Sequence, residues 1–77
     1  MRIISQDGRS DIPYEKSILT LSNDCKVNVD AYINNRYVLL GKYSSIEKGA
    51  RAMEMCRDKY SRKANVFQFP KDEEEKV

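Results

Sequence analysis

The sequence has no histidine and only two cysteines, Cys25 and Cys56, among its 77 residues. Imidazole and clustered thiolates are the usual ligands of zinc and other transition metals, so we expect no metal site and no bound cofactor. The two cysteines lack C-x-x-C spacing, and we expect them to stay reduced rather than form a disulfide. Without histidine, the common hydrolytic triads are excluded, and a general base active near neutral pH would need a strongly perturbed carboxylate or lysine. The composition therefore favours a protein that is not an enzyme.

Long apolar runs are also missing. None approaches the ~18 residues of a membrane-spanning helix, and the first residues lack the charged-then-apolar layout of a signal peptide. We expect a soluble, cytoplasmic protein without membrane contact. Glycine-rich phosphate loops and the D-x-D-x-D-G ladder of calcium loops do not occur either. The length predicts one domain whose core is close to the minimum for independent folding.

Charge is distributed unevenly along the chain. The formal net charge is +2, but residues 71–77, "KDEEEKV", hold four acids and two lysines. We expect this segment to be a disordered acidic tail and residues 1–70 to form the single domain. Twelve basic and eight acidic residues remain in that domain. This excess permits contact with nucleic acid, yet it forms no concentrated basic stripe.

Hydrophobic periodicity predicts several short strands. Strict alternation makes 27–33 the clearest, and the Asn-containing link at 34–36 predicts an antiparallel hairpin with 37–43. Further strands are expected at 2–5, 17–22 and 65–70, with a tight turn at "QDG". Pro13 limits the segment 11–15 to an edge bridge or bend.

A helix is predicted over 44–62, because Ser44 stands three residues before Glu47 as in a capping box. Its expected apolar stripe comprises Ile46, Ala50, Met53, Cys56 or Arg57, and Tyr60. Gly49 costs about 1 kcal/mol relative to alanine unless it lets the helix approach the sheet closely. The predicted fold class is α+β, an antiparallel sheet of about four or five short strands with one helix packed across one face.

Several segments resemble a known group of proteins. "RIISQDG" and "DIPYE" near the start, "YSSIEKGARAMEM" in the predicted helix and "FQFP" followed by acids are similar to small, mostly uncharacterised proteins of Firmicutes phages and prophages. The resemblance covers most of the chain, with 17–36 as the variable part. Gly49 and Cys56 stand where similar proteins more often have alanine and leucine. The resemblance implies an accessory phage protein and carries over no catalytic or binding residues.

The carboxylates of the first corner are a candidate catalytic group. Asp7, Asp11 and Glu15 could meet around the first turn, as paired carboxylates do in glycoside hydrolases. The alternative is structural, with Asp7 serving the turn, Asp11 beside a bend and Glu15 in solvent. The sequence favours the structural alternative.

Two surfaces are candidates for binding a partner. Tyr32, Arg36, Tyr37, Lys42 and Tyr43 interleave aromatic and basic residues along the hairpin, as single-strand binders do, although Tyr37 and Tyr43 share strand parity with Leu39 and could be core residues. The helix carries charges that are mostly solvated, and Met55 lies off the expected stripe. The candidate partner-binding residues are Tyr32, Arg36, Lys42, Lys48, Arg51, Met55 and Lys59.

These features predict a phage-encoded, non-enzymatic binding protein in the bacterial cytoplasm. The favoured role is inhibition of an anti-phage defence system, as an anti-CRISPR or another anti-defence protein, by binding a host protein. The alternatives are a small nucleic-acid-binding accessory protein and a phage structural or assembly component. Homodimerisation is a separate expectation, through an exposed edge of the hairpin or of the last strand.

Overall fold

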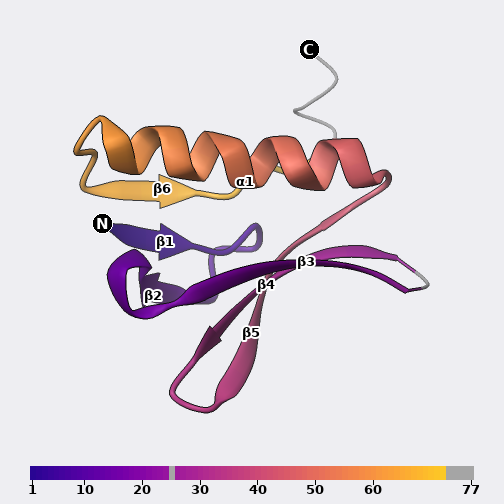
Figure 1. Ribbon diagram of the computed structural model, residues 1–77, viewed down its shortest axis with the longest axis horizontal. Helices are drawn as coiled ribbons and strands as arrows, with labels where there is room; N and C mark the ends of the chain where they lie inside the picture. Colours follow the sequence, from indigo (N-terminus) through magenta and orange to yellow (C-terminus); the bar gives the residue numbers. More distant parts are fainter. Residues whose placement is uncertain (25, 73–77) are drawn as a thin grey trace.

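Six short strands, one 3₁₀ turn and one α-helix make up the part of the chain that the computed structural model describes, residues 1–24 and 26–72 (Figure 1). The strands form two three-stranded sheets, ordered β2-β1-β6 and β3-β4-β5. The predicted α+β class is confirmed. The elements in chain order are β1 (Arg2–Ile4), β2 (Asp11–Pro13), η1 (Tyr14–Lys16), β3 (Ile18–Asn23), β4 (Val27–Ile33), β5 (Arg36–Tyr43), α1 (Ile46–Ser61) and β6 (Val66–Gln68).

The smaller sheet joins the two ends of the described chain. Its central strand β1 pairs antiparallel with β2, Ile3 opposite Ile12, and parallel with β6, Ile3 opposite Phe67. Parallel neighbours need a long crossover connection, and here the crossover contains the whole second sheet and the helix. The strands expected in one antiparallel sheet are thus divided between two, and one pair is parallel.

The larger sheet contains the predicted hairpin. Along β4 the residues alternate strictly between buried and half-exposed, with Val27, Val29, Ala31 and Ile33 buried. Asn34 and Asn35 both have positive φ, 53° and 64°, the conformation that a two-residue hairpin turn requires. The alternation and the turn predicted from the sequence are confirmed here.

A β-bulge in β5 overturns the expected parity of that strand. Val29 pairs with Gly41 and Asp30 with Leu39, so Leu40 is the extra residue. Beyond it the inward-facing side switches, and Tyr43 is buried while Tyr37 and Leu39 are exposed. The expectation that these three residues share one face is wrong, because an insertion shifts every later side chain to the opposite face.

The helix α1 packs against the larger sheet and runs along one side of the molecule, above β6 and β1 in Figure 1. Its N-cap is Ser45, whose Oγ accepts the N–H of Lys48 at 3.3 Å, and not the predicted Ser44. Its buried residues are Gly49, Ala52 and Cys56. The predicted stripe is rotated away from this face, since the true contact side consists of small residues that contribute little to a hydrophobic pattern.

Of the predicted stripe, Ile46, Ala50, Arg57 and Tyr60 are exposed and Met53 is half-buried. Met55, expected off the apolar face, instead packs half-buried against the core. The core draws on both sheets and on the helix; its buried apolar members are Ile3, Ile12, Val27, Val29, Ala31, Ile33, Leu40, Tyr43, Ala52, Cys56, Phe67 and Phe69. Burial raises the pKa of the Cys56 thiol to about 11, so the thiol is uncharged at neutral pH.

Gln6 connects the two sheets. Its backbone N–H donates to the carbonyl of Leu40 at 2.7 Å, and its Oε1 accepts the N–H of Lys42 at 2.9 Å. Its Nε2 donates to the carbonyls of Lys42 at 3.1 Å and Pro70 at 2.9 Å. The Tyr43 hydroxyl donates to the same Pro70 carbonyl at 2.7 Å. One side-chain amide therefore ties the edge of β5 to the first turn and to the segment after β6.

The predicted acidic tail begins as an ordered segment. Asp72 Oδ1 accepts the backbone N–H and the hydroxyl of Ser44, and the Lys48 ammonium lies 3.7 Å away. Residues 73–77 of the predicted tail lie outside the described residues, as does the predicted turn residue Cys25.

We expect Gly49→Ala to lower the free energy of unfolding by about 1 kcal/mol. A Cβ at this position would lie 2.8 Å from Leu21 Cδ1 and 2.9 Å from Val27 Cγ1, and this overpacking outweighs the gain in helix propensity. Urea unfolding followed by circular dichroism measures the change. The matched control is Ala50→Gly at the exposed neighbour, which loses about 1 kcal/mol through propensity alone. A stabilised Gly49→Ala protein would contradict the close contact.

Gln6→Ala should cost about 2 kcal/mol of unfolding free energy, because three side-chain hydrogen bonds are lost and Lys42 keeps unpaired backbone groups. Gln68→Ala is the control, since Gln68 makes a single 3.3 Å bond to the Ser5 carbonyl. Equal losses in the two variants, measured by urea unfolding, would show that Gln6 does not have this connecting role.

Candidate functional site

The acidic residues of the first corner do not converge. Asp7 accepts the Ser5 hydroxyl at 2.6 Å and the Arg9 N–H at 3.0 Å, inside a turn in which Gly8 has a φ of 76°. Asp11 pairs with Arg2 across β1 and β2. Glu15 accepts the amine of Met1 at 2.7 Å. Asp7 thus serves the turn as expected, whereas Asp11 lies within β2 and not beside a bend, and Glu15 pairs with the terminal amine.

Hydrogen bonds lower the pKa of all three carboxyl groups. For Asp7 the main cause is the Ser5 hydroxyl, followed by the Arg9 N–H. For Asp11 it is the hydrogen bond from Arg2, and for Glu15 the bond from the terminal amine. A general acid at neutral pH requires the opposite shift. The electrostatics of the corner therefore suit ionised, structural carboxylates.

The uncovered face of the β3-β4-β5 sheet, named here the outer sheet face, carries an apolar cluster. Cross-strand register places Ile18, Tyr32 and Tyr37 in one row and Thr20, Asp30 and Leu39 in the next. Ile18 is 63% exposed, Tyr37 67% and Leu39 43%. The rings of Tyr32 and Tyr37 pack with centroids 4.9 Å apart. Three exposed side chains, Ile18, Tyr37 and Leu39, thus lie beside the half-buried ring of Tyr32.

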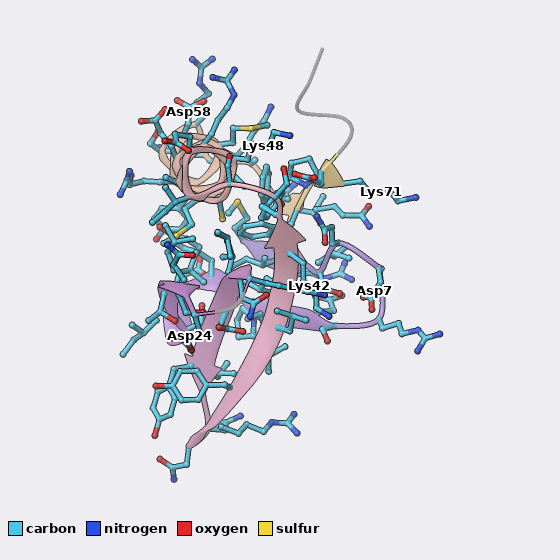
Figure 2. All side chains as sticks on the ribbon, turned by 90° about the vertical axis from the view of Figure 1, so that its right-hand side faces the viewer. Asp7, Asp24, Lys42, Lys48, Asp58 and Lys71 are labelled. Carbon is cyan, nitrogen blue, oxygen red and sulfur yellow. The ribbon has the colours of Figure 1, made fainter. Side chains whose placement is uncertain are left out.

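The third row of the outer sheet face is polar and consists of Ser22, Asn28 and Lys42. Asn28 Oδ1 is buried and has no hydrogen-bond partner among the described residues, while Ser22 Oγ lies 3.5 Å from Asp30 Oδ2. Lys42 projects from β5 on the side where the Asp7 loop lies (Figure 2). The face therefore has an apolar end near the hairpin turn and a polar end near the helix N-terminus.

The seven residues predicted to contact a partner are divided between two elements. Tyr32 and Lys42 lie on the outer sheet face, and Arg36 is exposed beside the turn, opposite Ile33. The other four belong to α1, on the opposite side of the sheet: Lys48, Arg51, Met55 and Lys59. The structure thus brings together only the hairpin members of the set.

Sequence reasoning missed Ile18 and Leu39 as exposed apolar residues. The bulge conceals Leu39, because without it Leu39 shares parity with the buried Tyr43. Ile18 is exposed because its cross-strand partner is Tyr32 rather than a core residue. Only the alternation of β4 could have indicated these exposed residues, because side chains paired with its outward-facing residues point outward as well.

A groove of about 460 Å³ lies between η1, β3 and α1. Tyr14 and Tyr60 form one wall, with ring centroids 4.4 Å apart. The other lining residues are Glu15, Ser17, Leu19, Met53 and Arg57. The groove runs beside the free edge of β3 and is open to solvent.

The pKa of Asp7 predicts a specific acid sensitivity. Because it is lower in the folded than in the unfolded chain, the ionised carboxylate stabilises the fold at neutral pH, and this contribution is lost as the pH falls below about 4. Asp7→Asn, whose amide oxygen can accept the same bonds, should therefore lose less stability on acidification than the unsubstituted chain. Urea midpoints at neutral and acidic pH measure this, with the exposed Glu54→Gln as control. Identical acid sensitivity in Asp7→Asn and the unsubstituted chain would contradict the role of Asp7.

Among residues 1–24 and 26–72, no group of three or more cysteine, aspartate or glutamate side chains is placed to hold a metal ion. The one α-helix in this part of the chain is too short and too polar to cross a membrane. The chain matches no protein-family model, and comparison with curated proteins and with solved structures finds no similar protein. The outer sheet face is the feature of the molecule from which a function can be inferred.

Proposed function

We propose that the chain is a small, phage-encoded, non-enzymatic binding protein that contacts a host protein through the outer sheet face. The observation that carries this proposal is the exposed cluster of Ile18, Tyr32, Tyr37 and Leu39. A sheet face normally buries its apolar side chains against another layer, and among residues 1–24 and 26–72 a second layer covers only the opposite face. The cluster has the composition expected of a surface that a partner covers.

The arrangement matches the anatomy of a protein–protein interface. Tyrosine is enriched among residues that dominate binding energy, and such residues sit at the centre of a polar rim. Next to the two tyrosines on the outer sheet face, Thr20 and Asp30 supply polar positions of such a rim. Tyr32 is half-buried against Tyr37, so the pair presents a firm rather than a loose apolar surface.

A nucleic-acid partner is the second candidate, supported by Tyr37, Arg36 and Lys42 on one hairpin. Two features count against it. The Tyr32 and Tyr37 rings pack against each other, which leaves less ring surface for base stacking. The Asp30 carboxylate also lies in the middle row, between the tyrosines and Lys42, where it would repel phosphate.

The biological setting follows from the resemblance to small phage proteins. A short phage protein that binds a host protein without chemistry fits the role of an inhibitor of anti-phage defence, such as an anti-CRISPR protein. A structural or assembly role in the phage particle would use the same surface on a different target. The identity of the protein that this chain captures from host lysate distinguishes the inhibitor role from the assembly role.

Tyr37→Ala should abolish capture of the host target while leaving the fold intact. The Tyr37 side chain is mostly in solvent, and truncating a central interface tyrosine costs about 2 kcal/mol, roughly thirtyfold in affinity. Tagged protein is co-expressed with the defence system and purified from lysate, and phage plating on defended cells gives the functional readout. Arg51→Ala, an exposed residue of α1 on the other side of the sheet, is the control and should behave like the unsubstituted chain.

Three results would contradict the proposal. Retention of capsid or tail proteins would favour the assembly role. Binding to short DNA or RNA that weakens steeply with salt would favour the nucleic-acid role. Capture of a defence protein that survives Tyr37→Ala but fails with Arg51→Ala would place the binding surface on the helix.

A further inference from the structure

The sheets leave four strand edges, of which two are short and one is partly covered. Gln6 covers the β5 edge from Leu40 to Lys42. The edge strand β2 is three residues long and ends in Pro13, which has no N–H to donate. The edge strand β6 is also only three residues long. Short edges, proline and covering segments are the usual means of preventing strand-to-strand association.

The fourth edge, that of β3, has none of these protections. β3 spans six residues, Ile18–Asn23, with the sequence "ILTLSN" and no charge or proline. It pairs with β4 on one side only. Within the described residues, no backbone hydrogen bond from another segment reaches its other side. A bare, uncharged edge of this length is a template for a further strand.

The sequence of β3 is complementary to itself in one antiparallel register. When two copies pair about a twofold axis at Thr20, Thr20 meets the partner's Thr20 and Leu19 meets the partner's Leu21. Leu19 and Leu21 both lie on the side that faces α1, since their β4 neighbours are the buried Ala31 and Val29. Leucines therefore meet leucines on the helix side, and threonines meet on the outer face, a favourable cross-strand pair.

The flanking charges agree with this register. Lys16 precedes β3 and Asp24 follows it, and both are exposed. Lys16 is the last residue of η1 and Asp24 is the first residue after β3, so antiparallel pairing centred on Thr20 brings each Lys16 close to the partner's Asp24, and by symmetry the same contact forms twice. In Figure 2, Asp24 lies on the other side of the molecule from Asp7, away from the β5 edge that Gln6 covers. A new strand can therefore approach β3 without displacing that contact.

The groove beside β3 provides room for the added side chains. Leu19, Met53 and Tyr60 line it, and its volume is about 460 Å³. Leu19 and Met53 are only half-buried. The partner's Leu21 packs against its own Gly49 and would lie beside Leu19 at the border of this groove, covering apolar surface that the single chain leaves open.

We propose that two copies of this chain associate by antiparallel pairing of β3 with β3 about a twofold axis at Thr20, joining the two larger sheets into one continuous sheet. The earlier expectation of a dimer named the hairpin or the last strand; the structure moves the contact to β3. The proposal is independent of the proposed function, because it concerns the purified chain alone.

Sedimentation equilibrium at micromolar concentration tests the association. The mass should be twice the 9.0 kDa of one chain. Thr20→Lys places two ammonium groups at the axis and should weaken the dimer at least about tenfold, whereas Thr20→Val, which keeps the β-branched shape, should leave it within about twofold. Circular dichroism checks that both variants remain folded.

A charge exchange tests the register and does not depend on the Thr20 variants. Lys16→Glu and Asp24→Lys each set like charges opposite one another twice, and each should weaken the dimer roughly tenfold. The double variant restores opposite charges and should recover most of the affinity. A single-chain mass across the micromolar range overturns the proposal. So does a dimer that is insensitive to Thr20→Lys, or one in which the double variant is weaker than both single variants.

Discussion

The fold depends on the side-chain amide of Gln6, which pairs with the backbone of Lys42 in β5 as a neighbouring strand would. Gln6 offers one acceptor and two donors at a spacing that matches the N–H and C=O of Lys42, and it contacts Pro70 in addition. The backbone bond from Gln6 to Leu40 and the bond from the Tyr43 hydroxyl to Pro70 support the same contact. The remaining contacts between the sheets are apolar, and apolar side chains pack without fixing direction. The hydrogen bonds set the relative orientation of the sheets, and the shared core around Ile3, Leu40 and Phe69 then fills the space between them.

That orientation explains why one face of the larger sheet is left in solvent. The smaller sheet and α1 use the inner face, and the bulge at Leu40 lets two successive residues of β5, Leu40 and Gly41, turn inward. The same bulge leaves Leu39 and Tyr37 outside. The β-bulge that completes the core thus also leaves exposed the residues on which the proposed binding surface depends.

Local features could be predicted from the sequence and distant ones could not. The alternation of β4 and the Asn34–Asn35 turn depend on neighbouring residues, and both were found. The Gln6–Lys42 contact joins residues 36 positions apart and leaves no periodic trace. The helix contact face was misplaced because Gly49, Ala52 and Cys56 are small, while the larger Ile46 and Tyr60 dominate the pattern. Of the candidate site, Tyr32 and Tyr37 were recognised as aromatic residues, but the separation of Tyr37 and Leu39 from the buried Tyr43 depends on a bulge that composition does not reveal.

The parallel pairing of β1 with β6 has a consequence for how the chain reaches its native state. Residues 2–4 are synthesised well before residues 66–68, yet the two segments are neighbours in the smaller sheet. The central strand of the smaller sheet must wait for a loop of more than sixty residues to close, and closing long loops slows folding. The β3–β4–β5 meander, whose contacts are local, can form while translation continues. We therefore expect the larger sheet to form before the smaller one, so that β1 waits for β6 although it is synthesised earlier.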